Sequence, residues 1–491
     1  MSAIIVLSFL LVLLSFIIKP LLKIFRLYWK TRHIHAAEGH YLLGQTLKVG
    51  LLKSHERLPF LIRQTIITAK NGESIFRLWL GGKLWVIPIN GKAVKDILDS
   101  NEELEKGDAY DFLGDWIGDG LLISIGSKWK GRRKLITPSF HFGMLAGYME
   151  TFNYHARIMM EILEGEVGKE FNMYNNVKRA ALDIICDAAM GVHASAQTNP
   201  NHPYVIAVGK FNLLTVDYIF KPWLQIPILY SWFGFAKEKQ DQLDILVSFS
   251  KKVIKERKME IAQGNIQERN GKKTFLDMLL TLEGLTDRDI QNEVDTFMFE
   301  GHDTTSSGTC WILWCLACHP HLQEKVHEEI YSIFGDSDRD MENEDLPKLP
   351  YFDRFIRECI RFRPPVPIIQ RLLNNDFKMG GKTIPKGAFI LISPMLQHHN
   401  PEIFPDPEKF DPDRFLPENI SSRHPYDYIP FSAGPRNCVG QKFAIYEQKC
   451  IVSWIIRKFR IEAKSELTSN KPCPEVVLVP SNQLYVTLHK R

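Results

Sequence analysis

A single long helical segment constrains the fold of this chain more than any other feature. Thr286 and Asp289 form a helix-capping pattern, and apolar residues around them recur at helical spacing: Leu285, Ile290, Val294, Phe297 and Met298. The pattern continues to Leu316 and stops at His319, because the residue before a proline rarely adopts the helical conformation. A helix of this extent is about 45 Å long and would cross a whole domain.

Helical patterns also dominate the chain between about residues 90 and 365, whereas strand-like runs are short and lie at 75–80, 84–89, 388–392 and 483–488. Prolines crowd the irregular segment 385–435. No repeat with a period of about 20 to 50 residues is apparent, which argues against a solenoid or a propeller. The sequence therefore predicts a mostly α-helical protein with small β-sheets.

Composition narrows the functional class. The 491 residues are 45% hydrophobic and 24% charged, as in globular proteins. The 61 Lys and Arg against 57 Asp and Glu leave a net charge of +4, too little for a nucleic-acid-binding surface over the whole chain. Eight cysteines are far too few for a disulfide scaffold, so we expect free thiols in a reducing compartment.

The N-terminus differs from the rest of the chain. Residues 2–18 carry no charge and are mostly Ile, Leu, Val and Phe, a run long enough for one membrane-spanning helix. Positive charges follow this run, whereas a cleaved secretory signal, the alternative, carries them before it. We therefore expect a transmembrane signal anchor over residues 1–22, a basic linker over 23–45, and a domain over 46–491 that faces the cytosol.

A short loop around Cys438 carries the most specific chemical signal. Phe431, Gly434, Arg436, Cys438 and Gly440 stand at fixed spacing before an apolar helical run. Backbone N–H groups of a Gly-rich turn and of the following helix N-terminus would stabilise a metal-binding thiolate, and Arg436 would add a cation for an anionic cofactor group. A buried cysteine in a tight turn explains any one of these residues, but not their joint spacing.

The pattern Phe-x-x-Gly-x-Arg-x-Cys-x-Gly resembles the haem-thiolate loop of the cytochrome P450 monooxygenases. The resemblance covers roughly residues 80–464 and implies the cytochrome P450 fold, with haem b (iron protoporphyrin IX) as cofactor and Cys438 as its axial metal ligand. Phe431, Gly434, Arg436 and Gly440 would then contact the haem. Segment 36–40 departs from the family, because it lacks the Pro-Gly-Pro hinge that usually follows the anchor.

The middle of the long helix contains Glu300, followed by Gly301, Asp303 and Thr304, three residues that favour a helix interior poorly. A helix distortion with solvated polar groups is one interpretation. The resemblance instead assigns Asp303 and Thr304 to an acid–alcohol pair that delivers protons for dioxygen activation, and Gly301 to making room above the haem. Glu300 resembles the glutamate of family 4, the fatty-acid ω-hydroxylase group, which in many members forms an ester with a haem methyl; the same ester is a hypothesis here.

Further motifs occur in the order that the resemblance implies. Glu358 and Arg361 would form a buried charge network with Arg414 that braces the Cys438 loop. Trp129 and Arg133 resemble the family's Trp-x-x-x-Arg helix and would contact haem propionates, with Arg371 and Arg436 as further contacts. The basic cluster at the same helix suits docking of an acidic electron donor and comprises Lys128, Lys130, Arg132, Arg133 and Lys134.

The sequence is therefore identified as a membrane-bound haem-thiolate monooxygenase that resembles family 4. The resemblance implies electrons from NADPH through a reductase, a contribution from cytochrome b5, a lipophilic substrate (a fatty acid, aliphatic chain or xenobiotic), and an endoplasmic reticulum membrane location. The aromatic segment 220–235 is either a buried connection or a surface that dips into the bilayer. The alternatives are a reductase-independent haem-thiolate isomerase or dehydratase, and a non-catalytic haem-binding protein. Asp303 and Thr304 argue against both.

Overall fold

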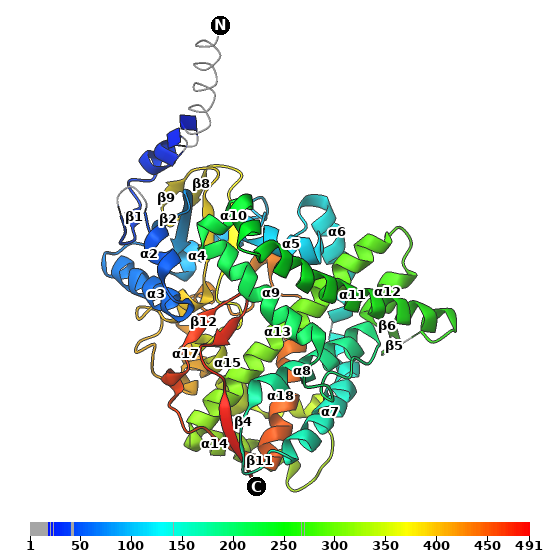
Figure 1. Ribbon diagram of the computed structural model, residues 1–491. Coiled ribbons are helices and arrows are strands. Elements are labelled where there is room, and N and C mark those ends of the chain that lie inside the picture. Colours follow the sequence, from blue (N-terminus) through cyan, green and yellow to red (C-terminus); the bar gives the residue numbers. More distant parts are fainter. Residues whose placement is uncertain are drawn as a thin grey trace.

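The protein is built around one long central helix, surrounded by shorter helices, with β-sheets at the periphery (Figure 1). The computed structural model describes residues 18–19, 21–22, 24–40, 44–140, 142–266, 268–269 and 271–491. The helices, numbered as in Figure 1, are α2 Thr46–Leu51, α3 Ser54–Lys70, α4 Gly91–Leu98, α5 Asp111–Ile117, α6 Gly126–Ile136, α7 Phe142–Glu164, α8 Met173–Ile185, α9 Pro203–Phe220, α10 Pro227–Trp232, α11 Phe235–Ala262, α12 Phe275–Thr281, α13 Asp287–Cys318, α14 Pro320–Phe334, α15 Pro350–Phe362, α16 Pro394–His398, α17 Pro417–Ser421 and α18 Gln441–Lys458.

The central helix is α13, and both of its predicted ends are confirmed. Thr286 is the N-cap residue, and its hydroxyl oxygen accepts a hydrogen bond from the Asp289 backbone N–H at 3.1 Å. The helix ends at Cys318, before the His319-Pro320 step. α13 packs against α8, α11, α15 and α18, and its C-terminal half is almost entirely buried. It continues without a break through Gly301 and Thr304, so the helix distortion that was the alternative interpretation of this segment is absent.

The largest sheet has five strands in the order β1-β2-β3-β10-β7. The pair β2/β3 is antiparallel, β3/β10 is parallel and β10/β7 is antiparallel, with Arg371 of β7 opposite Ile390. A second sheet has the order β11-β14-β4, and three two-stranded ladders complete the β structure. The strands are β1 His35–Ala36, β2 Ile75–Leu80, β3 Lys83–Pro88, β4 Glu170–Asn172, β5 Glu268–Arg269, β6 Lys272–Lys273, β7 Ile369–Leu372, β8 Phe377–Met379, β9 Lys382–Ile384, β10 Phe389–Ile392, β11 Phe459–Glu462, β12 Pro472–Pro474, β13 Leu478–Pro480 and β14 Tyr485–Lys490.

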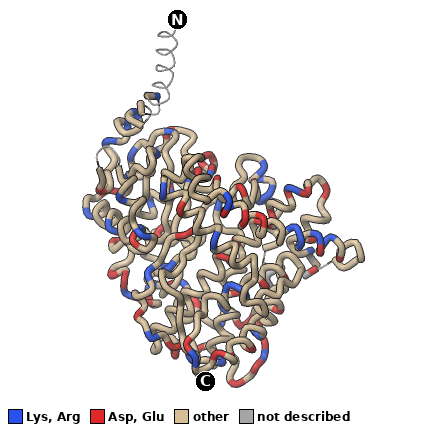
Figure 2. Tube along the Cα trace, viewed as in Figure 1, with Lys and Arg blue, Asp and Glu red and all other residues tan. Residues whose placement is uncertain are grey.

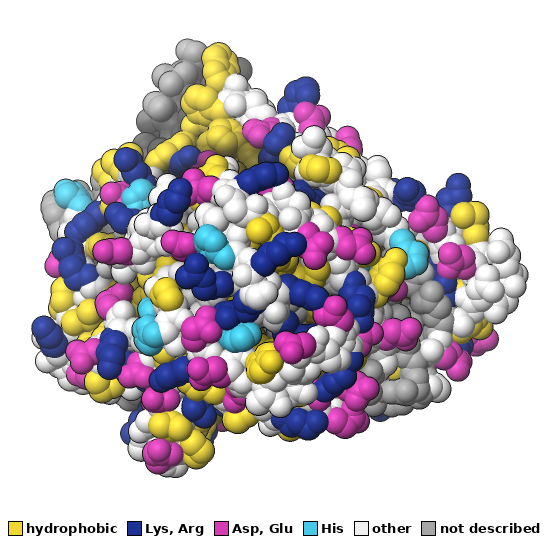
Figure 3. Space-filling view, turned by 90° about the horizontal axis from the view of Figure 1, so that it is seen from below, with side chains coloured by type: hydrophobic (Ala, Val, Ile, Leu, Met, Phe, Trp, Pro, Cys, Tyr) yellow, Lys and Arg dark blue, Asp and Glu magenta, His cyan; other side chains and the backbone are white. Residues whose placement is uncertain are grey.

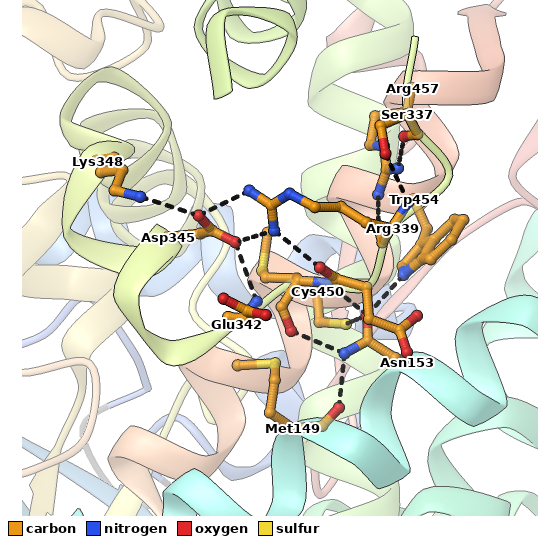
Figure 4. A network of polar contacts seen from close by, with 12 residues as sticks. Met149, Asn153, Ser337, Arg339, Glu342, Asp345, Lys348, Cys450, Trp454 and Arg457 are labelled. Carbon is orange, nitrogen blue, oxygen red and sulfur yellow. Dashed lines mark hydrogen bonds and ion pairs between the residues drawn. The ribbon is translucent and has the colours of Figure 1, made fainter. Parts of the chain in front are cut away.

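A buried asparagine connects three segments that are distant in the sequence through hydrogen bonds (Figure 4). Asn153 of α7 exchanges hydrogen bonds with the backbone of Met341, and its side-chain oxygen accepts one from the Trp454 indole of α18 at 2.8 Å. Arg339 of the same loop binds Asp345, and Arg457 donates to the Arg339 carbonyl. These contacts fix α18, whose N-terminus directly follows the Cys438 loop.

Charges of both signs alternate over the molecule, as the low net charge implies (Figure 2). All eight cysteines are free thiols, as expected. The predicted anchor at 1–22 falls mostly outside the described residues, and within the described part of the chain no helix is long and apolar enough to cross a membrane.

Candidate functional site

The Cys438 loop is a tight turn that precedes α18. The Cys438 backbone N–H donates to the Phe431 carbonyl at 3.0 Å, and a short 3₁₀ turn spans Gly434–Arg436 between them. Gly434 has a positive φ of 67°, and a Cβ added there would lie 1.9 Å from the Leu98 carbonyl oxygen. The turn therefore requires glycine at Gly434. At Gly440 an added Cβ meets nothing within 4 Å, so sterics do not demand glycine there.

The thiol of Cys438 is not ionised by its loop alone. Burial raises its pKa to about 12 and Glu300 adds to the rise, whereas a hydrogen bond from the Gly440 backbone and the charge of Arg133 lower it. The donors predicted from the sequence thus act in the expected direction, but the cost of burial outweighs them. A thiolate here depends on the positive charge of a bound metal.

Cys438 faces a cavity of about 320 Å³, within the range of ligand sites in proteins. Glu300, Gly301 and Thr304 of α13 also line this cavity, as their shared helix face predicts. Of the eight cysteines, all of which are described, only Cys438 lines it. The rest of its wall is mostly apolar and includes Leu113, Val216, Phe299, Val366, Ile369 and Val477.

Basic residues crowd one region of this cavity. Lys106, Arg133, Arg371 and Arg436 all line it, as does Trp129, whose ring lies 4.2 Å from the Arg436 guanidinium. Burial lowers the pKa of Arg436 to about 9, with a further decrease from the charge of Arg371, and the pKa of Lys106 is lowered for the same two reasons. Mutual repulsion of this kind is relieved by an anion.

The sequence missed Lys106, which stands in a loop without a recognisable motif.

The arginines of this region differ in how many hydrogen bonds they donate to oxygen atoms of the protein. Arg133 donates to the backbone and side-chain oxygens of Asn437 at 2.7 and 2.6 Å, which ties α6 to the residue before Cys438. Arg371 is 2% exposed, and among the described residues its side chain donates one hydrogen bond, to the Gln370 carbonyl. Arg436 donates to the carbonyls of Leu121 and Ser124, but its buried Nε has no partner among the described residues.

Thr304 and Asp303 point to different surroundings. The Thr304 hydroxyl lies in the cavity wall and donates to the Glu300 carbonyl at 2.6 Å. Asp303 is fully buried and does not line the cavity; its carboxylate lies 2.9 Å from Lys178 Nζ and accepts from Asn212 at 2.6 Å. Burial raises the pKa of Asp303, but the charges of Lys178 and His302 and the hydrogen bonds from Lys178 and Asn212 together outweigh burial and keep this pKa below the usual value. Lys178 belongs to α8 and carries no sequence signal of this role.

Glu300 and Gly301 complete the α13 face of the cavity. Burial raises the pKa of the Glu300 carboxyl to about 7, against the opposing charge of Lys106. A Cβ at Gly301 would lie 2.6 Å from the Ile185 side chain of α8. Glycine therefore allows α8 and α13 to approach closely, in addition to the room over a cofactor that the sequence suggested.

The predicted charge network behind the Cys438 loop is present. Arg361 forms two hydrogen bonds with the Glu358 carboxylate, at 2.7 and 2.8 Å, and both side chains are fully buried. Arg414 Nε lies 3.6 Å from the same carboxylate. Arg361 also donates to the carbonyls of His398 and Lys409, so that it joins α15 to the proline-rich segment before the loop.

Comparison with known proteins decides the family. The family model described as Cytochrome P450 matches residues 40–488. The chain belongs to the cytochrome P450 family. "Cytochrome P450 4V2" from Homo sapiens is 40% identical over 432 residues, which cover 85% of this chain and 82% of the relative. The 4V2 protein from Pongo abelii and "Cytochrome P450 4c3" from Drosophila melanogaster are each 41% identical, with the same coverage. The protein is thus a cytochrome P450 monooxygenase.

The residues of the cavity fit the haem that this family carries. Cys438 provides the thiol that would bind the iron. The neighbouring cations, among them Arg436 with its unpartnered Nε, would bind the acidic groups at the edge of the haem. When bound, the haem supplies an iron, ligated by a cysteine thiolate, at which dioxygen is activated. The protein supplies the ligand, the apolar wall and the polar groups of α13.

Proposed function

We propose that this cytochrome P450 is a membrane-bound enzyme that inserts one oxygen atom of O₂ into a C–H bond of a lipophilic substrate, with electrons from NADPH through a reductase. The supporting observation is the single apolar cavity that Cys438 shares with Glu300 and Thr304. The substrate is a fatty acid, another aliphatic chain or a xenobiotic of similar character. Apolar walls exclude water and hold such a chain without specific hydrogen bonds.

We assign Cys438 as the axial ligand of haem b, and Trp129, Arg133, Arg371 and Arg436 as residues at its propionates. Thr304 would hold and pass a proton at its Oγ1, which already lies in the cavity wall. Asp303 would act from behind Thr304, where Lys178 and Asn212 hold its carboxylate in place. Proton transfer by positioned groups of this kind contributes about 10²- to 10⁴-fold to rates.

Turnover in the presence and absence of reductase tests this function. Membranes that contain the protein, NADPH, a reductase and dodecanoate in ¹⁸O₂ should yield a hydroxylated acid that carries one ¹⁸O atom. Rearrangement of a lipid peroxide without reductase would instead identify an isomerase or dehydratase. Bound haem without turnover of aliphatic, aromatic or peroxide probes would favour a haem-binding protein.

The second part of the proposal concerns an ester between Glu300 and a haem methyl. Glu300 lies in the cavity close enough to Cys438 to raise its pKa, and its own carboxyl is half neutral near pH 7. Ester formation replaces the carboxyl O–H bond and a methyl C–H bond by a C–O bond and releases two protons and two electrons. O₂ would accept these together with two electrons from NADPH and two further protons, and would be reduced to two molecules of water. The intact mass of denatured, solvent-extracted protein should include the haem, and Glu300→Gln should abolish the addition. An apoprotein mass after turnover contradicts the ester.

The third part concerns the membrane. Apolar side chains are exposed on α2 and on segment 226–233, and Trp232 is 82% and Leu51 74% exposed. A Cβ at Gly50 of α2 would lie 3.1 Å from the Phe220 carbonyl and 3.6 Å from the Trp223 ring, which places α2 beside the connection that leads into segment 226–233. Both lie at the end from which the helical residues 24–30 project (Figure 1), whereas the opposite end carries mixed charges (Figure 3). We propose that this apolar end rests on the endoplasmic reticulum membrane, with residues 1–22 as anchor and the catalytic domain in the cytosol.

Docking of the reductase, and of cytochrome b5, would use part of the basic cluster on α6. Lys128 and Arg132 are bound by Asp289 at 3.0 and 2.6 Å and are therefore less available than the sequence suggested. Lys130 and Lys134 remain exposed and have no ion pair among the described residues. Replacing both by Gln should lower the rate of reduction more at low salt than at high salt.

A further inference from the structure

An arginine beside the cavity lacks the partners that its burial demands. Arg57 of α3 is 4% exposed, and its guanidinium stacks on the Phe220 ring at 4.4 Å. Within the described part of the chain, its Nε and Nη1 have no hydrogen-bond partner. A guanidinium presents five donors, and an unmet buried donor destabilises a protein by about 1–3 kcal/mol. A buried arginine of this kind indicates an absent acceptor.

The charged residues around Arg57 have a net positive charge that an anion could balance. Asp217 is the acid that acts most strongly on it, but the Asp217 carboxylate is already bound to Lys221 at 2.8 Å. Arg57 and Lys221 against Asp217 therefore leave one positive charge uncompensated. Burial lowers the pKa of Arg57, and an anion would reverse this effect.

Arg57 does not itself line the cavity, but it lies between the apolar end of the molecule and residues that do. Phe220, on which its guanidinium stacks, lines the cavity, and so do Pro474 and Glu475 of the β12–β13 hairpin. α3 packs along β12 (Figure 1), and α2 precedes α3 with its exposed apolar side chains. Glu475 is the acid on the cavity side, and burial raises its pKa to about 7, so it repels an anion only partly at neutral pH.

We propose that Arg57 binds the carboxylate head of an amphiphilic substrate whose aliphatic chain extends through the cavity toward Cys438. The inference deepens the proposed function and rests on it. With the head held at α3 and Phe220, the opposite end of the chain is the part presented at Cys438, which would favour oxidation near that end. Binding far from the reacting bond is a usual source of positioning energy.

Binding to the full-length, haem-containing protein tests the proposal. The probes are dodecanoate and its methyl ester, whose dissociation constants follow from the change in the haem spectrum as each ligand enters. Arg57→Gln should weaken dodecanoate binding about tenfold or more and ester binding less than twofold. Arg63→Gln, on the same helix with a side chain that is 56% exposed, removes the same charge and should change neither.

Each other outcome decides against Arg57 in a distinguishable way. Equal weakening of acid and ester would make Arg57 structural, and an unchanged acid affinity would assign it to another anion, such as a lipid phosphate. Wild-type protein that binds the ester but not the acid overturns the carboxylate site while the aliphatic function stands. Binding of neither overturns both.

Should Arg57→Gln fail to retain haem, the wild-type protein still decides the matter. Dodecanoate binding should weaken with rising salt, whereas ester binding should not. Arg57→Lys, which keeps the charge but loses the planar fork, should bind the acid with intermediate affinity. Equal salt dependence for acid and ester contradicts the proposal.

Discussion

Two buried arginines, Arg361 and Arg371, differ in how many of their N–H donors are bound within the protein. Arg361 is fully buried and binds Glu358 twice and two backbone carbonyls as well. Arg371 is 2% exposed, makes one hydrogen bond to the neighbouring Gln370 carbonyl, and lies among further cations.

The number of bound donors distinguishes buried charges that stabilise the fold from buried charges that bind a ligand. Charges that brace a fold are complete within the chain, because an unpaired buried charge is costly. Charges that serve a ligand stay incomplete until it binds. Arg57 belongs to the second kind, and its position away from the other cations suggests a different ligand from theirs. Each of the following changes tests this division.

The largest effect is expected for Glu358, whose carboxylate belongs to the charges that stabilise the fold. Glu358→Gln leaves Arg361 buried without its counter-charge, so the free energy of unfolding should fall by about 3–5 kcal/mol, with loss of haem incorporation. Arg357→Gln on the same helix breaks an exposed pair with Asp353 and should cost less than about 1 kcal/mol. Denaturant unfolding of both variants measures the contrast; equal effects would abolish the distinction between the two kinds of charge.

The Cys438 loop provides the next test. Gly434→Ala places a methyl group against the Leu98 carbonyl at a positive φ and should destabilise the protein by about 2–4 kcal/mol. Gly440→Ala meets open space and should cost less than about 1 kcal/mol. Unfolding midpoints and haem content of the two variants check this. A Gly440→Ala variant as unstable as Gly434→Ala would mean that the loop requires glycine for another reason.

Arg371 should behave in the opposite way to Arg361. Arg371→Gln removes a cation that the protein alone leaves unpaired, so the free energy of unfolding of the apoprotein should change by less than about 1 kcal/mol. The haem should dissociate about 10- to 100-fold more readily, because charge-assisted hydrogen bonds to it are lost. Haem transfer to an excess of apomyoglobin measures this rate, with Glu300→Gln as the common background so that no ester to Glu300 can retain the haem. A large loss of apoprotein stability with unchanged haem retention would mean that Arg371 stabilises the fold and does not bind the haem.

The smallest effect concerns a buried carboxyl on α13. Burial raises the pKa of Asp295 to about 7, so the folded protein holds a proton that the unfolded chain releases near pH 4. This contribution to stability is complete below the unfolded pKa and is lost as pH rises from there through 7, by about 2 kcal/mol between pH 5 and 7. Asp295→Asn should flatten this decline in denaturant midpoints. Glu293 and Glu475 act in the same direction and remain as a background.

The sequence predicted what local signals can carry. The ends of α13 follow from a cap and a proline step, and the Glu358–Arg361 pair follows from three-residue spacing on one helix. The strand bounds were less accurate: β3 begins at Lys83 rather than 84, and β14 covers Tyr485–Lys490 rather than 483–488. Pairing with distant neighbours sets these ends, and the short strands β7 and β11 to β13 have no periodicity long enough to detect.

Tertiary partners lay beyond the sequence for the same reason. Lys178 stands 125 residues before Asp303, and no spacing rule connects an α8 lysine with an α13 aspartate. Lys106 and Glu475 come from a loop and a hairpin that both line the cavity, and Arg57 comes from a helix that packs on the same hairpin. Their burial, which gives them significance, is a property of the fold and not of any short motif.

Carbon monoxide binding to the reduced, membrane-bound protein tests the central claim most directly, with Cys438→Ser as the control. The account predicts the strongly red-shifted Soret band of a thiolate-ligated haem in the wild-type protein and its loss in the variant. A band typical of histidine-ligated haem in well-folded protein, or a red-shifted band that persists in Cys438→Ser, would contradict the assignment of Cys438 as the ligand.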